Sequence, residues 1–561
     1  MENRRILGIN RTQDASVCVL NSDGSAVAVQ KERLTRTKHA WGALDDIAAV
    51  YLPGLAPLMS QPFDMVVECY SSDPERKRKR HYEEELRRTV TLRGPALLTE
   101  VSHHLSHLFS CYFPSGFTDS AVMVIDCAGT QRKTLKETFP EAGEVDGEAV
   151  EVSSYYHCEA NSINCLHKSF WDVDWKRPHG LGAFYHLLTR KIFPGEGNEG
   201  KVMALASHGD ASALGLPPLT VRGGEVLIPE PWQSMIVDSQ DCRFVQGDTG
   251  AFERAANLAA AGQRCFEDAL LMIAQWLRQR SRSENLCFAG GVALNCCANA
   301  RLQAESGFKR IYIPPAPHDG GTAVGCALYG LAELEGADAC RRFSWRTDYL
   351  GIPRQNARLS ALAEMHPELE LTQCADLPFR LAELLEAGEV IGLFQERSEF
   401  GPRALGNRSI LADPRRSGVQ RWVNENVKGR ELFRPLAPTV LAEAAPDFFE
   451  GNTQGARFMQ YAVSVRENRR EQIRGVLHYD NSARIQVLTV DDNAQFYRII
   501  HNFFVRTGIP LVLNTSFNGK EEPIVETVED AIRCLLATHL HAVSFPPFLL
   551  RKRFRMQVPD L

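Results

Sequence analysis

The start of the chain alternates short apolar segments with turn residues, a pattern typical of strands joined by tight turns. Residues 6–10 are apolar, residues 16–20 carry valines at alternate positions, and residues 26–30 repeat this pattern. The sequence Asn21-Ser22-Asp23-Gly24 separates the second and third segments and favours a hairpin. The pattern therefore predicts three N-terminal strands.

Further along the chain, longer elements are indicated. Residues 121–125 and 148–157 are predicted as strands, and residues 252–280 carry apolar side chains at helical spacing. That helix leads into the apolar strand 286–289 and then into Gly290-Gly291. A buried strand followed by a glycine pair and a helix start is a common site for a nucleotide phosphate.

The regular pattern weakens between residues 341 and 376, where loop signals replace it. We therefore predict an N-terminal domain (residues 1–345), a linker (346–376) and a C-terminal domain (377–561). Helices and strands alternate in both domains, which predicts an α/β fold class.

Composition narrows the classes of function. The 561 residues are 44% hydrophobic and 24% charged, as in ordinary globular proteins. The net charge of −6 argues against a general nucleic-acid-binding protein, and no apolar run reaches the length of a membrane span. The 15 cysteines show no CxxC spacing, which indicates a reducing, cytoplasmic compartment. We expect no nucleic-acid or membrane partner, and a homodimer as the oligomer.

Two histidines and two aspartates are candidate metal ligands. His103 and His107 lie four residues apart, so on a helix both imidazoles face the same side. Such a pair commonly holds a divalent metal, although it also occurs on helix faces without one. Asp126 follows an apolar strand and Asp319 precedes two glycines, where strand-end loops supply oxygen ligands. This ligand set fits iron(II), manganese or zinc better than calcium but does not by itself fix the metal; we expect iron(II), with manganese or zinc as the alternatives.

The C-terminal half carries cationic side chains in turn-prone segments. Arg403 and Arg408 lie in the run 400–409, shortly after the apolar segment 390–394. A guanidinium group binds phosphate or carboxylate oxygens through two hydrogen bonds. A single arginine is commonly part of a surface salt bridge, but an ordered set predicts a site for a phosphorylated anion. Further candidates for this site are Lys428, Arg430, Arg434, Arg484, Asn514, Ser516 and Asn518.

Taken in order, these motifs resemble the carbamoyltransferases of the nodulation and antibiotic O-carbamoylation type. In the N-terminal half the resemblance rests on His103-His104-Leu105-Ser106-His107, Asp126, Glu199-Gly200-Lys201, residues 290–295 and Asp319-Gly320-Gly321. In the C-terminal half it rests on residues 401–409, 428–435 and 514–518. The resemblance implies a two-lobed N-terminal domain similar to actin-like ATPases and a C-terminal α/β domain similar to YrdC.

The resemblance also implies roles for individual residues. The metal ligands would be His103, His107, Asp126 and Asp319. Adenylate binding would involve Gln13, Glu199, Lys201, Gly290, Gly291 and Asn295. Carbamoyl phosphate and ATP, the latter with Mg²⁺, would bind to Arg403, Arg408, Lys428, Arg430, Arg434, Arg484, Asn514, Ser516 and Asn518. The catalytic side chains would be Lys38, His39, His104, Arg403 and Lys428. For Lys38 and His39, a solvated basic surface is the alternative.

One position departs from the family pattern. The family shows His-Asp-Ala-Ser after the first strand, whereas this chain has Gln13-Asp14-Ala15-Ser16. Glutamine does not titrate near neutral pH and cannot act as a base. Any role of that position in group transfer is therefore either limited to hydrogen bonding or moved to another residue.

The implied reaction is ATP-dependent O-carbamoyl transfer, through carbamoyl-adenylate, to a hydroxyl of a small-molecule natural product, with an antibiotic as the expected acceptor. Residues 40–100 and 130–180 are expected to shape the acceptor pocket, for either an aromatic scaffold or a sugar. Their tryptophans are Trp41, Trp171 and Trp175. The basic run 76–80 is expected to be a solvated helix face rather than an anion site.

Other classes of protein share parts of this pattern. An actin-superfamily small-molecule kinase would leave the arginine-rich half without a role, and a threonylcarbamoyl-type tRNA-modification enzyme would need a basic surface. A hydrogenase-maturation carbamoyltransferase would require zinc-finger cysteine pairs, which are missing here. A non-enzymatic scaffold would leave the motifs unexplained. The reaction products distinguish a kinase from an adenylate-forming carbamoyltransferase, because a kinase releases ADP whereas the adenylate route releases AMP and pyrophosphate.

Overall fold

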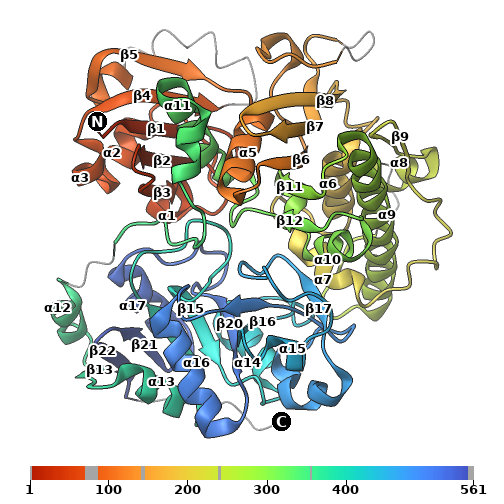
Figure 1. Ribbon diagram of the computed structural model, residues 1–561. Coiled ribbons are helices and arrows are strands. Elements are labelled where there is room, and N and C mark those ends of the chain that lie inside the picture. Colours follow the sequence, from red (N-terminus) through yellow and green to blue (C-terminus); the bar gives the residue numbers. More distant parts are fainter. Residues whose placement is uncertain (1–2, 70–85, 141–145, 238–241, 354–356, 554–561) are drawn as a thin grey trace. The chain divides into compact units, whose positions relative to one another are not determined.

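The computed structural model describes residues 3–69, 86–140, 146–237, 242–353 and 357–553 (Figure 1). The chain divides into two compact units, Met1–Trp345 and Arg346–Leu561, which we call the N-terminal and C-terminal units. Among the residues so described, no helix is long and apolar enough to cross a membrane.

The first sheet of the N-terminal unit has the strand order β3-β2-β1-β4-β5. Strands β1, β2 and β3 form an antiparallel meander, and β4 and β5 run parallel to β1. The meander is the three-strand start that the sequence predicts. The bounds are β1 Arg5–Asn10, β2 Ser16–Asn21, β3 Ala26–Gln30, β4 Phe63–Cys69 and β5 Leu92–Glu100.

The second sheet repeats this topology. Its order is β12-β11-β6-β7-β8, with β6, β7 and β8 as the meander and with β11 and β12 parallel to β6. The bounds are β6 Asp119–Ile125, β7 Val150–Glu159, β8 Ser162–Trp171, β11 Asn285–Ala289 and β12 Arg310–Tyr312. The two sheets form two lobes of one duplicated α/β plan, which is the two-lobed, actin-like arrangement that the resemblance implies.

Helices cover these sheets and join the lobes. α11 packs on β1, β2 and β4 of the first lobe, and it also packs against α5, which contacts β6, β7 and β11 of the second lobe. The helices are α1 Lys31–Thr35, a π-helix Ile47–Tyr51, α2 Leu52–Gly54, α3 Ala56–Met59, α5 His103–Tyr112, α6 Gly180–Ile192, α7 Glu199–Ala206, α8 Glu230–Val237, α9 Thr249–Ser281, α10 Cys296–Glu305 and α11 Thr322–Glu335. A small hairpin is formed by β9 Thr220–Arg222 and β10 Glu225–Leu227.

The close approach of α5 and α11 depends on Gly325. A Cβ atom at this position would lie 1.8 Å from the backbone oxygen of Ser106 on α5. Real Cβ atoms do not approach other atoms so closely, so glycine allows the two helix backbones to touch. The contact brings the N-terminal end of α11 beside the histidines of α5.

The C-terminal unit is built on one mixed sheet with the order β13-β22-β21-β14-β15-β20-β16-β19. Its strands are β13 Leu369–Gln373, β14 Ile391–Phe394, β15 Arg408–Ala412, β16 Ala437–Leu441, β19 Gln486–Leu488, β20 Leu511–Ser516, β21 Ala542–Phe545 and β22 Phe548–Lys552, and β17 Ala462–Ser464 pairs with β18 Ser482–Arg484. Its helices are α12 Leu359–Glu364, α13 Leu377–Glu386, α14 Val419–Val423, a π-helix Asn424–Lys428, α15 Ala445–Phe448, α16 Ala494–Thr507 and α17 Val528–Ala537. The α/β class predicted for the chain is therefore confirmed.

Several strand ends meet at one edge of this sheet. β20 runs antiparallel to β15 and β16, so its last residues lie beside the first residues of those strands. Ser409 at the start of β15 is paired with Ser516, and Ala437 at the start of β16 is paired with Asn514. β19 runs parallel to β16 and therefore begins at the same edge. Segments far apart in the sequence thus converge there.

The predicted linker, residues 346–376, needs correction. It contains α12 and the edge strand β13, which pairs with β22. Asp348 also accepts a hydrogen bond from the backbone N–H of Gly401 at 2.7 Å. An edge strand that is largely exposed carries little hydrophobic alternation, so the sequence pattern did not reveal it.

Candidate functional site

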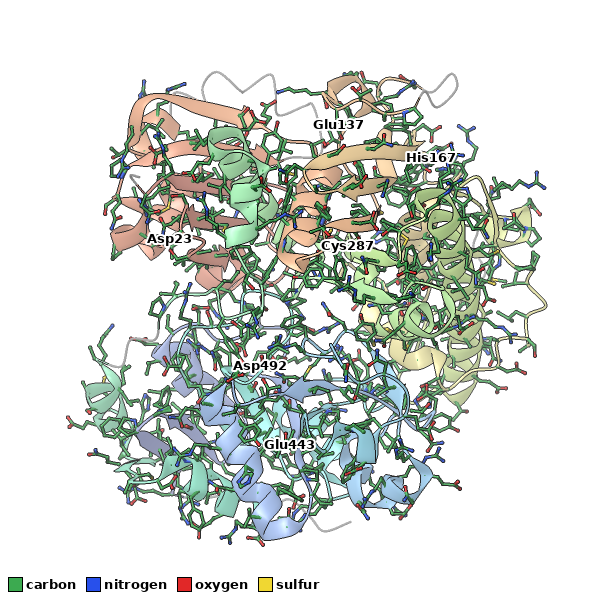
Figure 2. All side chains as sticks on the ribbon, viewed as in Figure 1. Asp23, Glu137, His167, Cys287, Glu443 and Asp492 are labelled. Carbon is green, nitrogen blue, oxygen red and sulfur yellow. The ribbon has the colours of Figure 1, made fainter. Side chains whose placement is uncertain are left out.

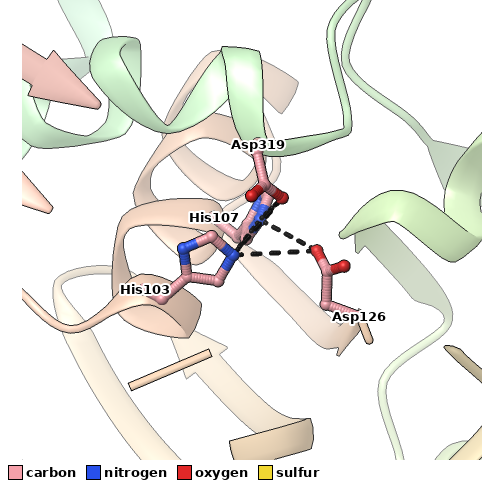
Figure 3. A group of neighbouring side chains, drawn as sticks. All are labelled: His103, His107, Asp126 and Asp319. Carbon is pink, nitrogen blue, oxygen red and sulfur yellow. Dashed lines mark hydrogen bonds and ion pairs between the residues drawn. The ribbon is translucent and has the colours of Figure 1, made fainter. Parts of the chain in front are cut away.

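The four predicted metal ligands converge in the N-terminal unit. His103 and His107 lie on α5, Asp126 directly follows β6, and Asp319 begins a 3₁₀ turn (Asp319–Gly321) before α11. One ligand atom from each lies within 4.8 Å of the others (Figure 3). Because α5 and β6 belong to the second lobe and α11 packs on the first, the cluster lies where the two lobes meet.

The geometry of the cluster suits a divalent cation. The Nε2 atoms of His103 and His107 are 3.2 Å apart, and both rings are fully buried. Nε2 of His107 lies 3.3 Å from Asp126 Oδ2, and Nε2 of His103 lies 3.4 Å from Asp319 Oδ1. Two buried imidazole nitrogens that face each other between two carboxylates form a nitrogen and oxygen donor set of the kind that binds divalent transition metals.

The charges of the cluster reinforce one another. Burial lowers the pKa of His103, but the nearby carboxylate of Asp319 and its other partners raise it well above the usual value. Burial raises the pKa of Asp126, but hydrogen bonds from His103 and His107 bring it well below the usual value. The carboxylate of Asp126 is therefore ionised and available to a cation.

Neighbouring groups orient these ligands. Thr12 donates a hydrogen bond of 2.6 Å to Asp319 Oδ2, and the backbone N–H of Gly291 donates one of 3.0 Å to Asp126 Oδ2. Cys69 Sγ lies 3.5 Å from Nδ1 of His103. Gly290 and Gly291 are predicted to bind a nucleotide, and the structure brings Gly291 into contact with a metal-ligand candidate. The sequence did not single out Thr12, which lies two residues after β1, or Cys69, which ends β4.

His104 points away from the cluster. Its Nδ1 lies 2.7 Å from Ser154 Oγ, and its backbone N–H donates to Glu151 Oε1 at 2.9 Å. Burial lowers the pKa of its fully enclosed imidazole well below the usual value, and the charge of Lys168 lowers it further. These contacts tie the start of α5 to β7, and the expected role of His104 at a substrate stays a prediction.

A buried ion pair supports this attachment. Lys168 Nζ lies 2.6 Å from Glu151 Oε2 and 3.0 Å from Glu137 Oε1, with the Lys168 side chain fully buried. Glu137 is labelled in Figure 2. Nothing in the sequence had pointed to this network, because its members are spread over two strands and a loop.

The segment after the first strand brings Asp14 to His39. Nδ1 of His39 is 2.9 Å from Asp14 Oδ1, and the backbone N–H of His39 donates to Glu32 Oε2 at 3.1 Å. Lys38 is exposed beside this pair, and Gln13 is half-buried in the same loop as Asp14.

The other predicted adenylate-binding residues lie on α7 and α10. Glu199 begins α7, and its Oε1 is 3.4 Å from Nδ1 of His186. The ammonium group of Lys201 lies 5.5 Å from the ring centroid of Phe193. Asn295 accepts a hydrogen bond from the first turn of α10 and exchanges two more with Gln263, so its side chain is already used within the fold.

Three of the predicted arginines gather in the C-terminal unit. Burial lowers the pKa of Arg430 well below its usual value, and the positive charges of Arg434 and Arg484 lower it further. Burial and the charge of Arg484 also lower the pKa of Arg434, against the opposing effect of Glu431. Nη1 of Arg434 lies 3.9 Å from Glu431 Oε2. We call Arg430, Arg434 and Arg484 the arginine cluster.

Part of this cluster lacks a partner. Nε of Arg484 is buried with no hydrogen-bond acceptor among the residues that the structure describes. Oδ1 of Asn514 is likewise buried without a donor within that part of the chain. Asn514 lies at the sheet edge described above, where its Nδ2 donates to Thr439 and Gln486 at 2.9 and 3.1 Å.

Lys428, Ser516 and Asn518 form a second group in this unit. The ammonium of Lys428 donates to Ser516 Oγ at 3.0 Å and also contacts the side-chain oxygen of Asn518. Ser516 Oγ in turn donates to Asn518 Oδ1 at 2.8 Å. Ser516 and Asn518, which alternate at and just after the end of β20, therefore both contact Lys428.

The segment with Arg403 and Arg408 is held by buried carboxylates. Glu399 Oε1 accepts the backbone N–H groups of Leu405, Asn407 and Arg408 at 2.7 to 3.2 Å. Arg403 is half-buried.

Arg408 is held within the fold. It is fully buried, its guanidinium donates to the carbonyl of Gln395 at 2.7 Å, and it lies over the ring of Phe394. Its contact with a ligand stays a prediction.

The segments expected to shape the acceptor pocket are only partly exposed. Trp171 is buried, whereas Trp41 and Trp175 are 55% and 39% exposed. A cavity of about 170 Å³ is lined by residues of these segments, by the two residues before α5, and by residues of α5 and α11: Glu100, Val101, Ser102, Leu105, Thr130, Thr134, Lys136, Glu137 and Tyr329. The basic run 76–80 lies outside the described residues.

Comparison with known proteins assigns the family. Residues 382–552 match the family described as Carbamoyltransferase C-terminus, and residues 238–328 match Carbamoyltransferase N-terminus. The chain is 33% identical to nodulation protein NolNO of Sinorhizobium fredii, over 95% of this chain and 78% of that protein. It is also 33% identical to nodulation protein NolO of Bradyrhizobium diazoefficiens, over 81% of this chain and 79% of that protein.

Among solved structures, HypF of T. kodakarensis is similar with a TM-score of 0.37 and 12% identity, over 60% of this chain and 49% of that chain. The matches to both halves of the family and the extended identity to the nodulation proteins agree with the motifs that the structure brings together. The chain therefore belongs to the carbamoyltransferase family, and it is an enzyme of that class.

Proposed function

We propose that this carbamoyltransferase is ATP-dependent and works in two steps. The C-terminal unit would form carbamoyl-adenylate from carbamoyl phosphate and ATP with Mg²⁺. The N-terminal unit would then transfer the carbamoyl group to a hydroxyl of a small-molecule natural product, with an antibiotic as the acceptor we expect. The observation that carries this proposal is the arginine cluster.

The arginine cluster has the charge that such substrates need. Carbamoyl phosphate carries about two negative charges and several strong acceptor oxygens, so it is bound best where cations are held close together. Burial and the positive charges of Arg434 and Arg484 lower the pKa of Arg430, and burial and the charge of Arg484 lower the pKa of Arg434, which supports a site where positive charge lacks a matching anion. A bound phosphate would relieve this repulsion and would supply an acceptor for Nε of Arg484.

The first step consists of two reactions, hydrolysis of carbamoyl phosphate and adenylation of the carbamate that is formed. Water cleaves carbamoyl phosphate to carbamate and inorganic phosphate. A carbamate oxygen then attacks the α-phosphorus of ATP, and pyrophosphate leaves. Cationic side chains stabilise the negative charge that develops on the transferring oxygens. We also assign Lys428 and Arg403 to this step. Lys428 contacts Ser516 at the same sheet edge, and Arg403 lies in the loop whose backbone N–H groups Glu399 accepts.

The second step belongs to the cluster in the N-terminal unit. His103, His107, Asp126 and Asp319 would hold a divalent metal, for which iron(II), manganese and zinc are the candidates. When bound, such a metal supplies Lewis-acid polarisation of an acyl or phosphoryl oxygen. The acceptor oxygen attacks the carbamoyl carbon, the bond from that carbon to the adenylate oxygen breaks, and AMP leaves.

The proposal predicts a product pattern that needs no acceptor. With ATP, MgCl₂ and carbamoyl phosphate, we expect the purified protein to release pyrophosphate only when carbamoyl phosphate is present. Arg484→Ala should lower this release about tenfold or more, because a charge-assisted hydrogen bond is lost. His103→Ala should retain it, because the metal cluster serves the second step.

The control variant is Arg474→Ala, which removes an arginine that is 53% exposed in the same unit. Release of ADP instead of AMP and pyrophosphate would refute the adenylate route and would favour a kinase. An equal loss of pyrophosphate in Arg474→Ala would show that the effect of Arg484→Ala is not specific.

A further inference from the structure

The contact between His39 and Asp14 has the form of a carboxylate-oriented histidine. Nδ1 of His39 lies 2.9 Å from Asp14 Oδ1, and the two residues both adopt a left-handed backbone with φ of 53°. Such a backbone is uncommon for residues with a side chain. Because both Asp14 and His39 adopt this uncommon backbone, the surrounding structure must hold the pair in place.

The hydrogen bond determines what the imidazole can do. A carboxylate at Nδ1 can only accept, so Nδ1 carries the ring proton and Nε2 of the neutral ring is the basic nitrogen. The side chain of His39 is 35% exposed, whereas that of Asp14 is 14% exposed. The oriented nitrogen is therefore on the more accessible end of the pair.

The loop before α7 lies against this nitrogen. A Cβ atom at Gly197, where φ is +72°, would come within 2.7 Å of His39 Nε2. Glycine is thus required both by the backbone angle and by the space that the ring occupies. Glu199, the first residue of α7, is close enough for the charge of His39 to lower its pKa, although burial raises it.

The pair stands beside the candidate metal cluster. Thr12, two residues before Asp14, donates a hydrogen bond of 2.6 Å to Asp319 Oδ2. His318, the neighbour of Asp319, has its Nε2 3.8 Å from Asp14 Oδ2. One short loop therefore contacts both the cluster and the carboxylate that orients His39.

We propose that Nε2 of His39 is the general base for the acceptor hydroxyl and that Asp14 positions it. This inference rests on the proposed function. The hydroxyl proton moves to Nε2 as the oxygen bonds to the carbamoyl carbon, and the bond from that carbon to the adenylate oxygen breaks with release of AMP. Gln13 cannot accept this proton, and His39 supplies from a neighbouring loop the base that position 13 lacks.

Charged groups around His39 set the pH at which it can act. Asp14 and Glu32 face it from the first loop and from α1, Glu199 from α7, and the positive charge of Lys38 lies beside it. Burial lowers the pKa of His39, but Asp14 and Glu32 outweigh this effect and raise it above the usual value, while Lys38 opposes them. His318 also faces Asp14. The base form is therefore present above the raised pKa and is lost as the pH falls.

The test uses water as the acceptor, so that it does not depend on the natural one. The metal-containing protein is mixed with ATP, MgCl₂ and carbamoyl phosphate, and both the pyrophosphate burst and the slower AMP release are measured. His39→Gln should leave the burst within about twofold and slow AMP release by about 100-fold or more, since general bases contribute about 10²–10⁴-fold. The matched control is His157→Gln, which removes a histidine that is 27% exposed and paired with Asp119 at 2.8 Å.

The outcomes separate the two proposals. A normal burst with unchanged AMP release in His39→Gln would overturn the role of His39 and leave the adenylate route intact. No burst in the unmodified protein would overturn the proposed function itself. In Asp14→Asn the acid limb of the AMP-release profile should move to lower pH, because the carboxylate that raises the pKa of His39 is gone. An acid limb that does not move would overturn the positioning role of Asp14.

Discussion

His103 uses both nitrogens of its ring. Nε2 faces His107 and the two aspartates, while Nδ1 lies 3.5 Å from Cys69 Sγ. A metal-binding Nε2 requires the proton on Nδ1, so the sulfur must accept it. Burial raises the pKa of Cys69, but the thiol of Cys326 and the imidazole lower it to about 5, which favours the accepting thiolate. We therefore expect Cys69 to orient His103, a candidate metal ligand, rather than to bind a metal itself.

Replacing Cys69 should weaken metal binding without removing a ligand. We expect Cys69→Ala to lower the affinity for Mn²⁺ or Fe²⁺ by about 10- to 100-fold, as is usual when the partner of a ligating histidine is lost. Calorimetric titration of the metal-free protein measures this affinity. Cys111→Ala, which removes another buried thiol, on α5, should bind metal as the unmodified protein does. Equal losses in both variants would contradict the role of Cys69.

At the scale of elements, the contact between α5 and α11 determines how the ligands meet. His103 and His107 are on one helix, and Asp319 lies directly before the other. The approach of the two backbones at Gly325 and Ser106 sets the distance between them. A shift of either helix by the width of a methyl group would move the aspartate out of the cluster.

Gly325→Ala should therefore disturb both stability and the metal site. The added Cβ would lie 1.8 Å from a backbone oxygen, which cannot move without its helix. We expect a loss of more than about 2 kcal/mol in the free energy of unfolding, as for overpacked cores, together with reduced metal content. Urea unfolding and elemental analysis measure these.

The control is Gly200→Ala in α7, where an added Cβ meets nothing within 4 Å. It should be neutral or slightly stabilising, because alanine is the better helix former. If Gly325→Ala were equally harmless, the helix contact would not determine the position of the ligands.

The elements with strong hydrophobic periodicity could be predicted from the sequence, but the tertiary contacts between them could not. The helix expected at residues 252–280 is α9, Thr249–Ser281, and the strand expected at 286–289 is β11, Asn285–Ala289. The i, i+4 spacing of His103 and His107 was informative because both lie on one helix. The convergence of Arg430 and Arg434 with Arg484 depends on the pairing of β16 with β19, which no local pattern encodes. The full burial of Arg408 is likewise not visible in a single sequence.

On the scale of the whole chain, duplication explains where the metal cluster lies. Each lobe of the N-terminal unit repeats one strand order, and the chain returns from β12 of the second lobe to α11, which packs on the first. The ligands thus come from α5 and the end of β6 on one side and from the start of α11 on the other. A bound metal would add a link between these three segments to the polar contacts that His103 and His107 already make with Asp126 and Asp319.

This link predicts a local response to metal removal. A ligand that binds only the folded state stabilises it by about 2.7 kcal/mol at a hundredfold excess over its dissociation constant. Chelation should therefore increase amide hydrogen exchange in α5, at the end of β6 and at the start of α11. Exchange in β15, β16 and β20 of the C-terminal unit should stay the same, because these strands carry none of the four ligands. His107→Ala should show the faster exchange already before chelation and no further change after it. Faster exchange in both units of the unmodified protein would contradict this prediction. The chelator would then act at another site, for example on Mg²⁺, and the cluster would not be the site of the metal.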